Sequence, residues 1–376
     1  MWIEQRLWTV GQGWTVTGDR GAEASLVLYF AAPGTLPGET ILADLRAAYG
    51  DAPILGCTTG GEILGSEVID DSVVVSALGF DRAKVRVMAH DLSDVSQSRA
   101  IGTTLARQLA GPELRAIFIL SDGTTVNGDA LVAGCMEAVA ADVVVTGGLA
   151  GDGARFKSTA VGCNDVMRPG RVAAVGFYGD SLSIGHGSFG GWDEFGPPRT
   201  ITRSAANILY ELDGEPALDL YKRYLGDEAQ GLPGSALLFP LSIRPQGADD
   251  GGEVVRTIVG IDEEAKSMIF AGDMPTGHLA RLMRGNFDNL VDGAGRAAES
   301  AAAVSGPCLG LLVSCIGRKL LMGQRIAEEV EIVADVLGKG SSLMGFYSYG
   351  EISPHGFTGK CELHNQTMTI TTISER

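Results

Sequence analysis

The chain has 376 residues, of which 45% are hydrophobic and 20% charged, and its formal net charge is −17. This composition is typical of a folded globular protein, and the length suits two or three domains. The negative charge argues against a nucleic acid partner, because a polyanion would be repelled. No run reaches the roughly 18 to 20 apolar residues of a membrane span, and the first ten residues lack the pattern of a signal peptide. We therefore expect a cytoplasmic protein that does not span a membrane.

The first half of the chain predicts strands that alternate with helices and then give way to a series of strands. Expected strands are 25–31, 53–57, 73–78, 84–89, 116–120, 143–146, 159–163, 172–178 and 182–189. Expected helices are 39–49, 95–110 and one that Asn127 caps and that runs to about residue 141. This order favours a mixed sheet.

The second half predicts the same kinds of element after a connector at 190–199, where glycines and paired prolines interrupt regular structure. Two helices, 207–212 and 217–225, form an expected bridge. A strand pair at 253–261 and 267–271 follows, and then a long helix from Pro275 to about Val304, because Leu279, Leu282 and Met283 fit a helical spacing. The remaining expected elements are a strand at 308–314, a helix at 321–337, and strands at 342–346 and 364–373.

One turn occurs twice. The sequence GCTTGGEI at 56–63 and GFYSYGEI at 345–352 share a glycine, a hydroxyl residue three places on, and Gly-Glu-Ile in the same register. We therefore predict an α/β (mixed α+β) fold of two pseudo-repeated halves, with mixed sheets flanked by helices. The predicted domains are 1–200 and 201–376, with the helical bridge at 201–226, and any site is expected where these turns meet.

These turns, together with LMRGNFDNLVDGA, VSCIGR and LHNQTMT, resemble the FIST family, the "F-box and intracellular signal transduction" domains. The resemblance spans nearly the whole chain, with an N-terminal FIST part before a C-terminal one. It implies a bacterial sensory protein that binds a small ligand and regulates a separate partner. That partner would be a histidine kinase of a two-component system or a cyclic-di-GMP enzyme (a diguanylate cyclase or phosphodiesterase).

A branch of the family senses nitric oxide through haem, and this is the sharpest version of the first hypothesis. A haem sensor needs an axial donor, normally a neutral imidazole inside an apolar pocket. His364, in the LHNQTMT motif at the start of a strand, is the expected axial ligand, and His355 in a Pro-His-Gly loop is the weaker alternative. Either histidine could instead be structural or exposed.

The second hypothesis is a haem-free binding module for an amino acid or another small metabolite. Its expected polar contacts are Glu62 and Glu351 in the two turns and Arg318 after a strand end. Asp152, in the comparable Gly-Asp-Gly turn, is a related carboxylate. Glycine-flanked acids also accept turn N–H groups, so a purely structural role stays open. Cys315, Tyr349 and Asn365 belong to the same motifs and complete the expected ligand contacts.

The third hypothesis is a cysteine-dependent enzyme that uses Cys315 or Cys57 with a turn carboxylate. No histidine is adjacent in sequence to activate either thiol, and no hydrolase elbow, P-loop or H-E-x-x-H motif is present. The six cysteines are scattered without metal-ligand spacing, which indicates buried small residues. We therefore expect a protein that is not an enzyme. The oligomeric state stays open.

Overall fold

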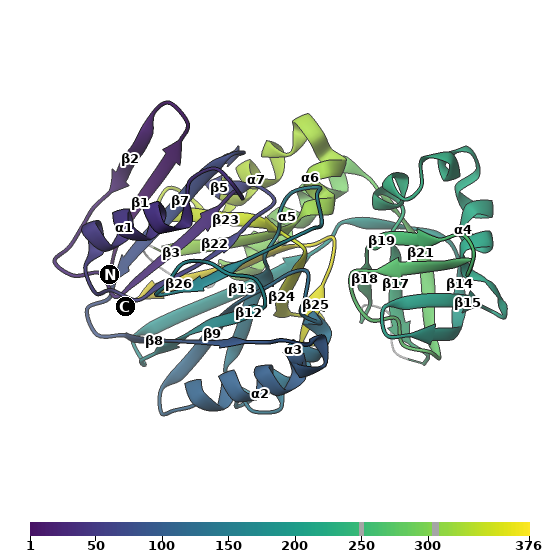
Figure 1. Ribbon diagram of the computed structural model, residues 1–376, viewed down its shortest axis with the longest axis horizontal. Coiled ribbons are helices and arrows are strands. Elements are labelled where there is room, and N and C mark those ends of the chain that lie inside the picture. The colour runs from purple at the N-terminus through teal and green to yellow at the C-terminus, as the bar shows by residue number, and fades with distance from the viewer. Residues whose placement is uncertain (248–251, 303–307) are drawn as a thin grey trace.

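In the computed structural model, which describes residues 1–247, 252–302 and 308–376, the chain forms two parts (Figure 1). The larger part, here called the body, comprises residues 1–191 and 286–376 and holds three six-stranded sheets. The smaller part, here called the lobe, comprises residues 192–285 and is built on a separate sheet of eight strands. Both chain ends lie in the body, on the side away from the lobe (Figure 1).

The body contains three copies of one unit, in which two parallel strands are joined by helix and followed by an antiparallel strand. The first copy comprises β3 (Leu26–Ala31), α1 (Gly38–Tyr49), β4 (Ile54–Thr58) and β7 (Ser72–Gly79). The second comprises β9 (Leu114–Ser121), α3 (Gly128–Met136), β10 (Val144–Leu149) and β12 (Arg171–Tyr178). The third comprises β22 (Cys308–Cys315), α6 (Ile316–Met322), α7 (Ala327–Leu337), β23 (Ser341–Ser348) and β26 (Met368–Glu375). The two Gly-Glu turns thus belong to the first and third of three repeats.

Short strands tie the three units into a closed cycle, because each unit adds a strand to the sheet of another. From the first unit, β5 (Glu62–Leu64) pairs with β23, and β6 (Glu67–Ile69) extends it. From the second, β11 (Val161–Cys163) pairs with β4, and from the third, β24 (Gly350–Pro354) pairs with β10 and carries β25 (Cys361–His364). The outer strands are β1 (Trp2–Thr9), β2 (Gly13–Gly18), β8 (Lys84–Asp91) and β13 (Leu182–Phe189).

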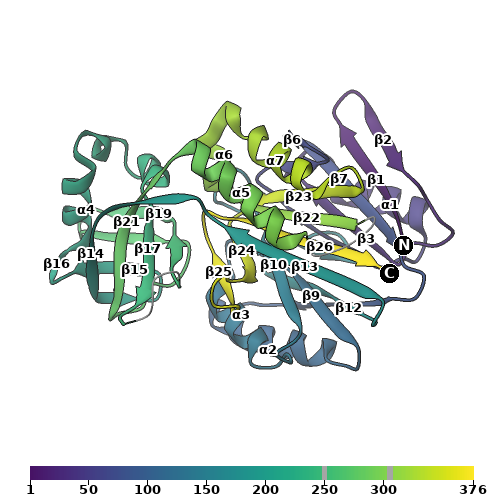
Figure 2. The same ribbon diagram turned by 180° about the vertical axis from the view of Figure 1, so that it is seen from behind.

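The inner faces of the three sheets share one apolar core. Phe30, Phe118 and Phe346, one from each unit, are each at most 1% exposed and belong to the same buried cluster. Helices cover the outer faces: α1 covers the first sheet, α2 (Ser98–Leu109) and α3 the second, and α5 (Phe287–Ala301) and α7 the third (Figures 1 and 2). Burial on both faces explains why these strands are nearly continuous apolar runs.

The lobe is an insertion between β13, the edge strand of the third sheet, and α5, which precedes β22 of the third unit. Its strands are β14 (Trp192–Ala205), β15 (Ile208–Leu212), β16 (Glu215–Pro216), β17 (Leu241–Pro245), β18 (Val254–Arg256), β19 (Ile258–Asp262), β20 (Ser267–Phe270) and β21 (His278–Gly285), and its helix is α4 (Ala217–Leu225). Ile201, Leu218 and Met268 lie in its own core.

Short 3-10 turns occur in both parts of the chain. In the body they occupy Val95–Gln97 and Gly323–Arg325, and in the lobe Gly226–Gly231 and Gly234–Leu238.

The predicted mixed α/β class is confirmed, and most predicted strands and helices of the first half lie close to their expected bounds, although the helix that Asn127 caps ends at Met136 and not near residue 141. The predicted domain boundary near residue 200 falls inside β14, the first strand of the lobe after the body (Figure 1). Within the described residues, no helix is both long and apolar enough to cross a bilayer.

The predicted long helix from Pro275 is wrong in its first part. Residues His278–Gly285 form β21, which pairs with both β14 and β17, and Ala280 and Leu282 alternate inward as strand residues do. The helix begins only after Asn286, whose side-chain oxygen accepts hydrogen bonds from the N–H groups of Asp288 and Asn289. Its predicted end near Val304 lies outside the described residues.

Two further predictions at the entrance to the lobe are wrong. The expected helix at 207–212 contains β15, because its apolar residues pack into a sheet between β14 and β20. The expected connector at 190–199 contains the start of β14. The pairing of β14 with β21 shifts register between Phe195 and Arg199. Pro197 and Pro198 fit there because neither has to donate a backbone N–H to the neighbouring strand.

A buried arginine fixes both points where the chain passes between body and lobe. Arg318 is fully buried and donates to the carbonyl oxygen of Gly190, just before β14, and to that of Leu290, in the first turn of α5. Its charge is balanced by Glu329 of α7, at 2.8 Å. Beside it, Gly191 (φ +85°) packs on the backbone of Asn289, where a side chain would clash. We call the residues 190–192 and 286–290 the hinge.

We predict that Arg318→Ala lowers the free energy of unfolding by about 3–5 kcal/mol, because Glu329 is left buried without its partner. The matched control is Arg203→Ala, which breaks an ion pair with Glu211 whose side chains are 54% and 32% exposed and should cost at most about 1 kcal/mol. Urea denaturation of both variants provides the measurement. Equal losses in the two variants would contradict the assignment of Arg318 as the hinge anchor.

Candidate functional site

The ends of β4, β10 and β23 meet at the centre of the body. The turns that follow them, 59–62, 149–152 and 348–351, form what we call the turn ring. Three backbone hydrogen bonds join the strand ends and turns in a cycle, from the N–H of Gly60 to the oxygen of Tyr347 (2.8 Å), from Gly151 to Thr58 (3.0 Å) and from Tyr349 to Leu149 (3.1 Å). Gly151 is needed here, because a Cβ atom would lie 2.9 Å from the nitrogen of Gly60.

Glu62 and Glu351 occupy equivalent places in the ring and are both fully buried. Each accepts a hydrogen bond from the hydroxyl three residues before it, Thr59 or Ser348. Each also accepts the hydroxyl and backbone N–H of the residue that leads into the third strand of the unit, Ser72 or Thr367. Burial raises the pKa of Glu62 to about 7 and that of Glu351 to about 8, against the opposing effect of these hydrogen bonds.

The third position of the ring holds Asp152, which is bound differently. Its carboxylate accepts the backbone N–H groups of Phe156, Lys157 and Ser158 at 2.8–3.0 Å. It also accepts the hydroxyl of Tyr349. Burial opposes ionisation, but the hydrogen bonds outweigh it and lower the pKa of Asp152. All three acids therefore shape the turns, and none offers a free carboxylate to a ligand.

A pocket of about 360 Å³ lies between the turn ring and the lobe, and we call it the cleft. The body contributes Gly123, Thr124, Val126, Leu149, Phe156, Cys315, Ile316, Gly317 and Tyr349. The lobe contributes Asn207, Leu237, Thr257, Val259, Phe270 and Ala271. Leu149 and Tyr349 are ring residues, so the ring forms part of the cleft wall.

The cleft is uncharged and partly aromatic. Among the described residues, no Asp, Glu, Lys, Arg or His side chain lines it. Phe156 stacks on Tyr349 with ring centres 4.7 Å apart and an interplanar angle of 17°. Thr257 is 5% exposed, and its hydroxyl has no hydrogen-bond partner within the described parts of the chain. A volume of this size and this mixture of apolar and few polar groups is typical of a small-molecule site.

Polar contacts connect body and lobe next to the cleft. Arg256 donates to Asp129 of α3 at 2.9 Å and to the backbone oxygen of Leu363 at 2.9 Å. Asp129 also accepts the backbone N–H of Asp273 at 2.7 Å, and Asn127 donates to the Asp273 carboxylate at 3.2 Å. Arg256 and Asn127 are the sequence neighbours of the cleft residues Thr257 and Val126.

Of the residues predicted as ligand contacts, Cys315 and Tyr349 line the cleft, whereas Arg318 and Asn365 do not. Burial raises the pKa of the Cys315 thiol to about 12, so it is protonated at neutral pH. Arg318 is committed to the hinge. Asn365 is fully buried and donates to the backbone oxygen of His364 at 3.0 Å. Cys57 is fully buried, and burial also raises its pKa.

The two candidate haem ligands do not fit that role. His364 is 3% exposed, donates from Nε2 to the oxygen of Ser353 at 3.0 Å, and stacks on His355 at 5.7 Å. His355 donates from Nε2 to the lobe residue Glu253 and accepts N–H groups at Nδ1. Both rings are thus engaged by the protein, and burial lowers the pKa of His364 to about 3. Within the described residues, no group of three or more His, Cys, Asp or Glu side chains is arranged to hold a metal ion.

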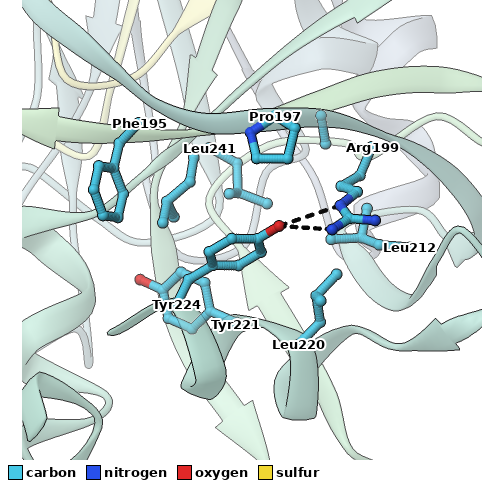
Figure 3. A pocket seen from close by; sticks show the side chains of 10 residues that line it. Phe195, Pro197, Arg199, Leu212, Leu220, Tyr221, Tyr224 and Leu241 are labelled. Carbon is cyan, nitrogen blue, oxygen red and sulfur yellow. Dashed lines mark hydrogen bonds between the residues drawn. The ribbon is translucent and has the colours of Figure 1, made fainter. Parts of the chain in front are cut away.

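A second pocket, inside the lobe, is too small for a ligand. Figure 3 shows the Tyr224 ring between α4 and β14, with its hydroxyl bound by Arg199 at 2.8 Å. The open volume of about 20 Å³ is about that of one water molecule. The pocket is therefore a packing feature of the lobe core.

Comparison with known families agrees with the sequence resemblance. The FIST N domain matches residues 25–215 and the FIST C domain matches residues 217–354, so the chain belongs to the FIST family. FIST domains are associated with signal transduction and small-ligand sensing. No curated protein matches the chain.

Among solved structures, the crystal structure of a cyanuric acid hydrolase from A. caulinodans aligns with 78% of this chain and 99% of its own. The identity is 12% and the TM-score 0.19. With so low a TM-score, this match is not evidence for a shared fold or activity.

The raised pKa values in the turn ring predict a pH-dependent stability. Unfolded carboxyls titrate near 4.5, so between pH 4.5 and 8 the folded state binds more protons than the unfolded state, and the free energy of unfolding falls as the pH rises. We expect a fall of roughly 1–2 kcal/mol between pH 6.5 and 8. Glu351→Gln should remove most of it. Above pH 6.5 the opposite slope from His364, whose burial lowers its pKa, diminishes as the unfolded histidine loses its proton.

Urea denaturation at pH 6.5, 7.2 and 8.0 measures this dependence. The control is Glu331→Gln, which changes an exposed glutamate of α7 and should keep the slope of the unmodified protein. If Glu351→Gln also keeps that slope, the ring glutamate is not the titrating group.

Proposed function

We propose that this FIST protein is a cytoplasmic, non-enzymatic sensor that binds a small uncharged molecule in the cleft between body and lobe. The observation that carries the proposal is that body and lobe together line the cleft, while in the described residues the hinge and polar contacts such as Arg256–Asp129 and His355–Glu253 connect the two parts. A molecule in this pocket contacts body and lobe at once, so its binding energy depends on their relative position. The association of FIST domains with small-ligand sensing supports the same role.

The signal would be a change in the position of the lobe. A ligand stabilises whichever arrangement gives it more contacts, and the hinge and the Arg256–Asp129 contact are the elements that must adjust. A separate signalling protein, such as a histidine kinase or a cyclic-di-GMP enzyme, would read the lobe position.

The cleft supports a haem-free sensor over a haem sensor. The histidines near the cleft are already engaged by backbone groups, and neither His364 nor His355 lines it. The cleft also supports binding over catalysis, because the Cys315 thiol is protonated and no acid or base side chain lines the described cleft beside it. The charged anchors expected for an amino acid ligand lie elsewhere, so the ligand is an uncharged one.

We predict that Ala271→Trp abolishes ligand binding by filling the cleft from the lobe side, while the fold is kept. The protein should gain about 2.7 kcal/mol of stability at a ligand concentration 100 times the dissociation constant. The small-molecule fraction of a bacterial extract should therefore raise the Tm of the unmodified protein and leave that of Ala271→Trp unchanged. A thermal-shift assay measures both values.

Ala265→Trp is the matched control for this experiment. Ala265 is exposed in the turn between β19 and β20 and does not line the cleft, so this variant should show the full thermal shift. An equal shift in Ala271→Trp would place the ligand outside the cleft, and the absence of any shift in the unmodified protein would contradict the sensor proposal.

A further inference from the structure

We infer that the ligand of the cleft is a planar, uncharged ring that carries an amide, with its C=O and N–H groups directed at the lobe. This inference rests on the proposed function, because it names the chemistry of the molecule that the cleft would take. Three observations carry it, from Thr257, from Asn207 and from the aromatic pair on the body side.

Thr257 provides an unused hydrogen-bonding group at a fixed position. It lies between β18 and β19, and its backbone oxygen accepts the N–H of Ala271 at 2.9 Å, so the residue is held in place. Its side-chain oxygen is buried and has no partner in the described structure, and the residue itself lines the cleft. A buried hydroxyl without a partner is destabilising, and a ligand that pairs with it recovers that loss. A hydroxyl both donates and accepts, so it suits a carbonyl or an N–H group.

Asn207 lies in the same wall and adds a second, complementary group. Its amide nitrogen donates to the backbone oxygen of Phe270 at 2.8 Å, which orients the side chain. The described residues supply no donor to its Oδ1 atom, which is therefore an acceptor for an N–H of the ligand. A ligand that offers C=O to Thr257 and N–H to Asn207 carries both groups of an amide.

The body side of the cleft suits a flat ring. The Tyr349 hydroxyl is fixed by the oxygen of Gly153 at 2.9 Å and by Asp152, and its ring stacks on Phe156. Phe156 is 46% exposed and has a positive φ of 51°, an uncommon conformation that holds its ring over the tyrosine. An aromatic ligand can extend this stack, since offset stacking is the favoured arrangement of such rings.

The absence of charge in the described lining excludes an ionised ligand. A carboxylate placed in this cleft would lose its hydration without gaining a cationic partner, since Arg318 and Arg256 are both committed to other groups. The cleft should therefore bind a neutral amide much more tightly than the corresponding carboxylate.

Two matched pairs of probes test this inference by isothermal titration calorimetry. Nicotinamide and uracil carry an amide outside or inside a planar ring, and nicotinate and orotate are the same rings with a carboxylate. We expect at least one amide to bind at least tenfold more tightly than its acid. Equal affinity within both pairs, or failure of both amides to bind, would overturn the inference.

Substitutions at Thr257 test the role of its hydroxyl. Thr257→Val should weaken amide binding about threefold to tenfold, as expected for one lost hydrogen bond, while the Tm of the ligand-free protein stays the same or rises. Thr257→Ser should restore binding. The matched control is Thr146→Val, which removes another unpartnered buried hydroxyl that does not line the cleft and should leave affinity unchanged.

The outcomes separate this inference from the sensor proposal. Unchanged affinity in Thr257→Val would contradict the amide contact, whatever the probes show. If that variant does not fold, the comparison of each amide with its acid on the unmodified protein decides the question. Failure of both amides, together with a thermal shift by the extract that Ala271→Trp abolishes, would overturn only the ligand class and leave the sensor proposal standing.

Discussion

The cyclic backbone hydrogen bonds of the turn ring are the constraint on which the body depends. Each unit presents the end of a parallel strand, and the three ends approach so closely that the backbones bond directly to one another. Such an approach requires glycine at Gly151, and it draws short strands of each unit into the sheet of another. The buried acids Glu62, Glu351 and Asp152 hold the turns in the shape that makes these contacts. Their role is to build the ring that the cleft uses as one wall.

The lobe lies on only one side of a body that is built from three similar units. It is inserted next to only one of the three units, and the cleft forms on the side of the ring that faces it. Arg318 holds both strands of the hinge through carbonyl oxygens of Gly190 and Leu290. In the proposed function, the body would keep its arrangement while the position of the lobe changes with what occupies the cleft.

The sequence predicts much of this architecture, because local signals dominate in the body. Apolar runs such as 116–120 and the cap at Asn127 identify strands and helices directly, and the shared Gly-Glu turn correctly marks equivalent positions. The copy of this turn in the second unit is harder to recognise, since Leu149 replaces the hydroxyl residue and Asp152 replaces the glutamate. Its similarity lies in backbone geometry, which the residue pattern does not record.

The lobe and the cleft are where sequence reasoning fails. Leu279, Leu282 and Met283 satisfy a helical spacing, while Ala280 and Leu282 alternate inward as strand residues do, and pairing with two neighbouring strands decides in favour of the strand. Of the cleft residues, Cys315 and Tyr349 are predicted from motifs, but Thr257 and Asn207 carry no local signal. Thr257 stands out because its buried hydroxyl has no partner in the described structure. Both residues come to line the cleft only because the folded lobe packs beside segments of the body that are far away in the chain.

The most direct test of a ligand site between body and lobe is equilibrium dialysis of the purified protein against bacterial small-molecule extract, with retained compounds identified by mass spectrometry. The account predicts that the unmodified protein retains at least one uncharged compound that Ala271→Trp does not. Retention of the same compounds by both proteins, or of none by either, would contradict it.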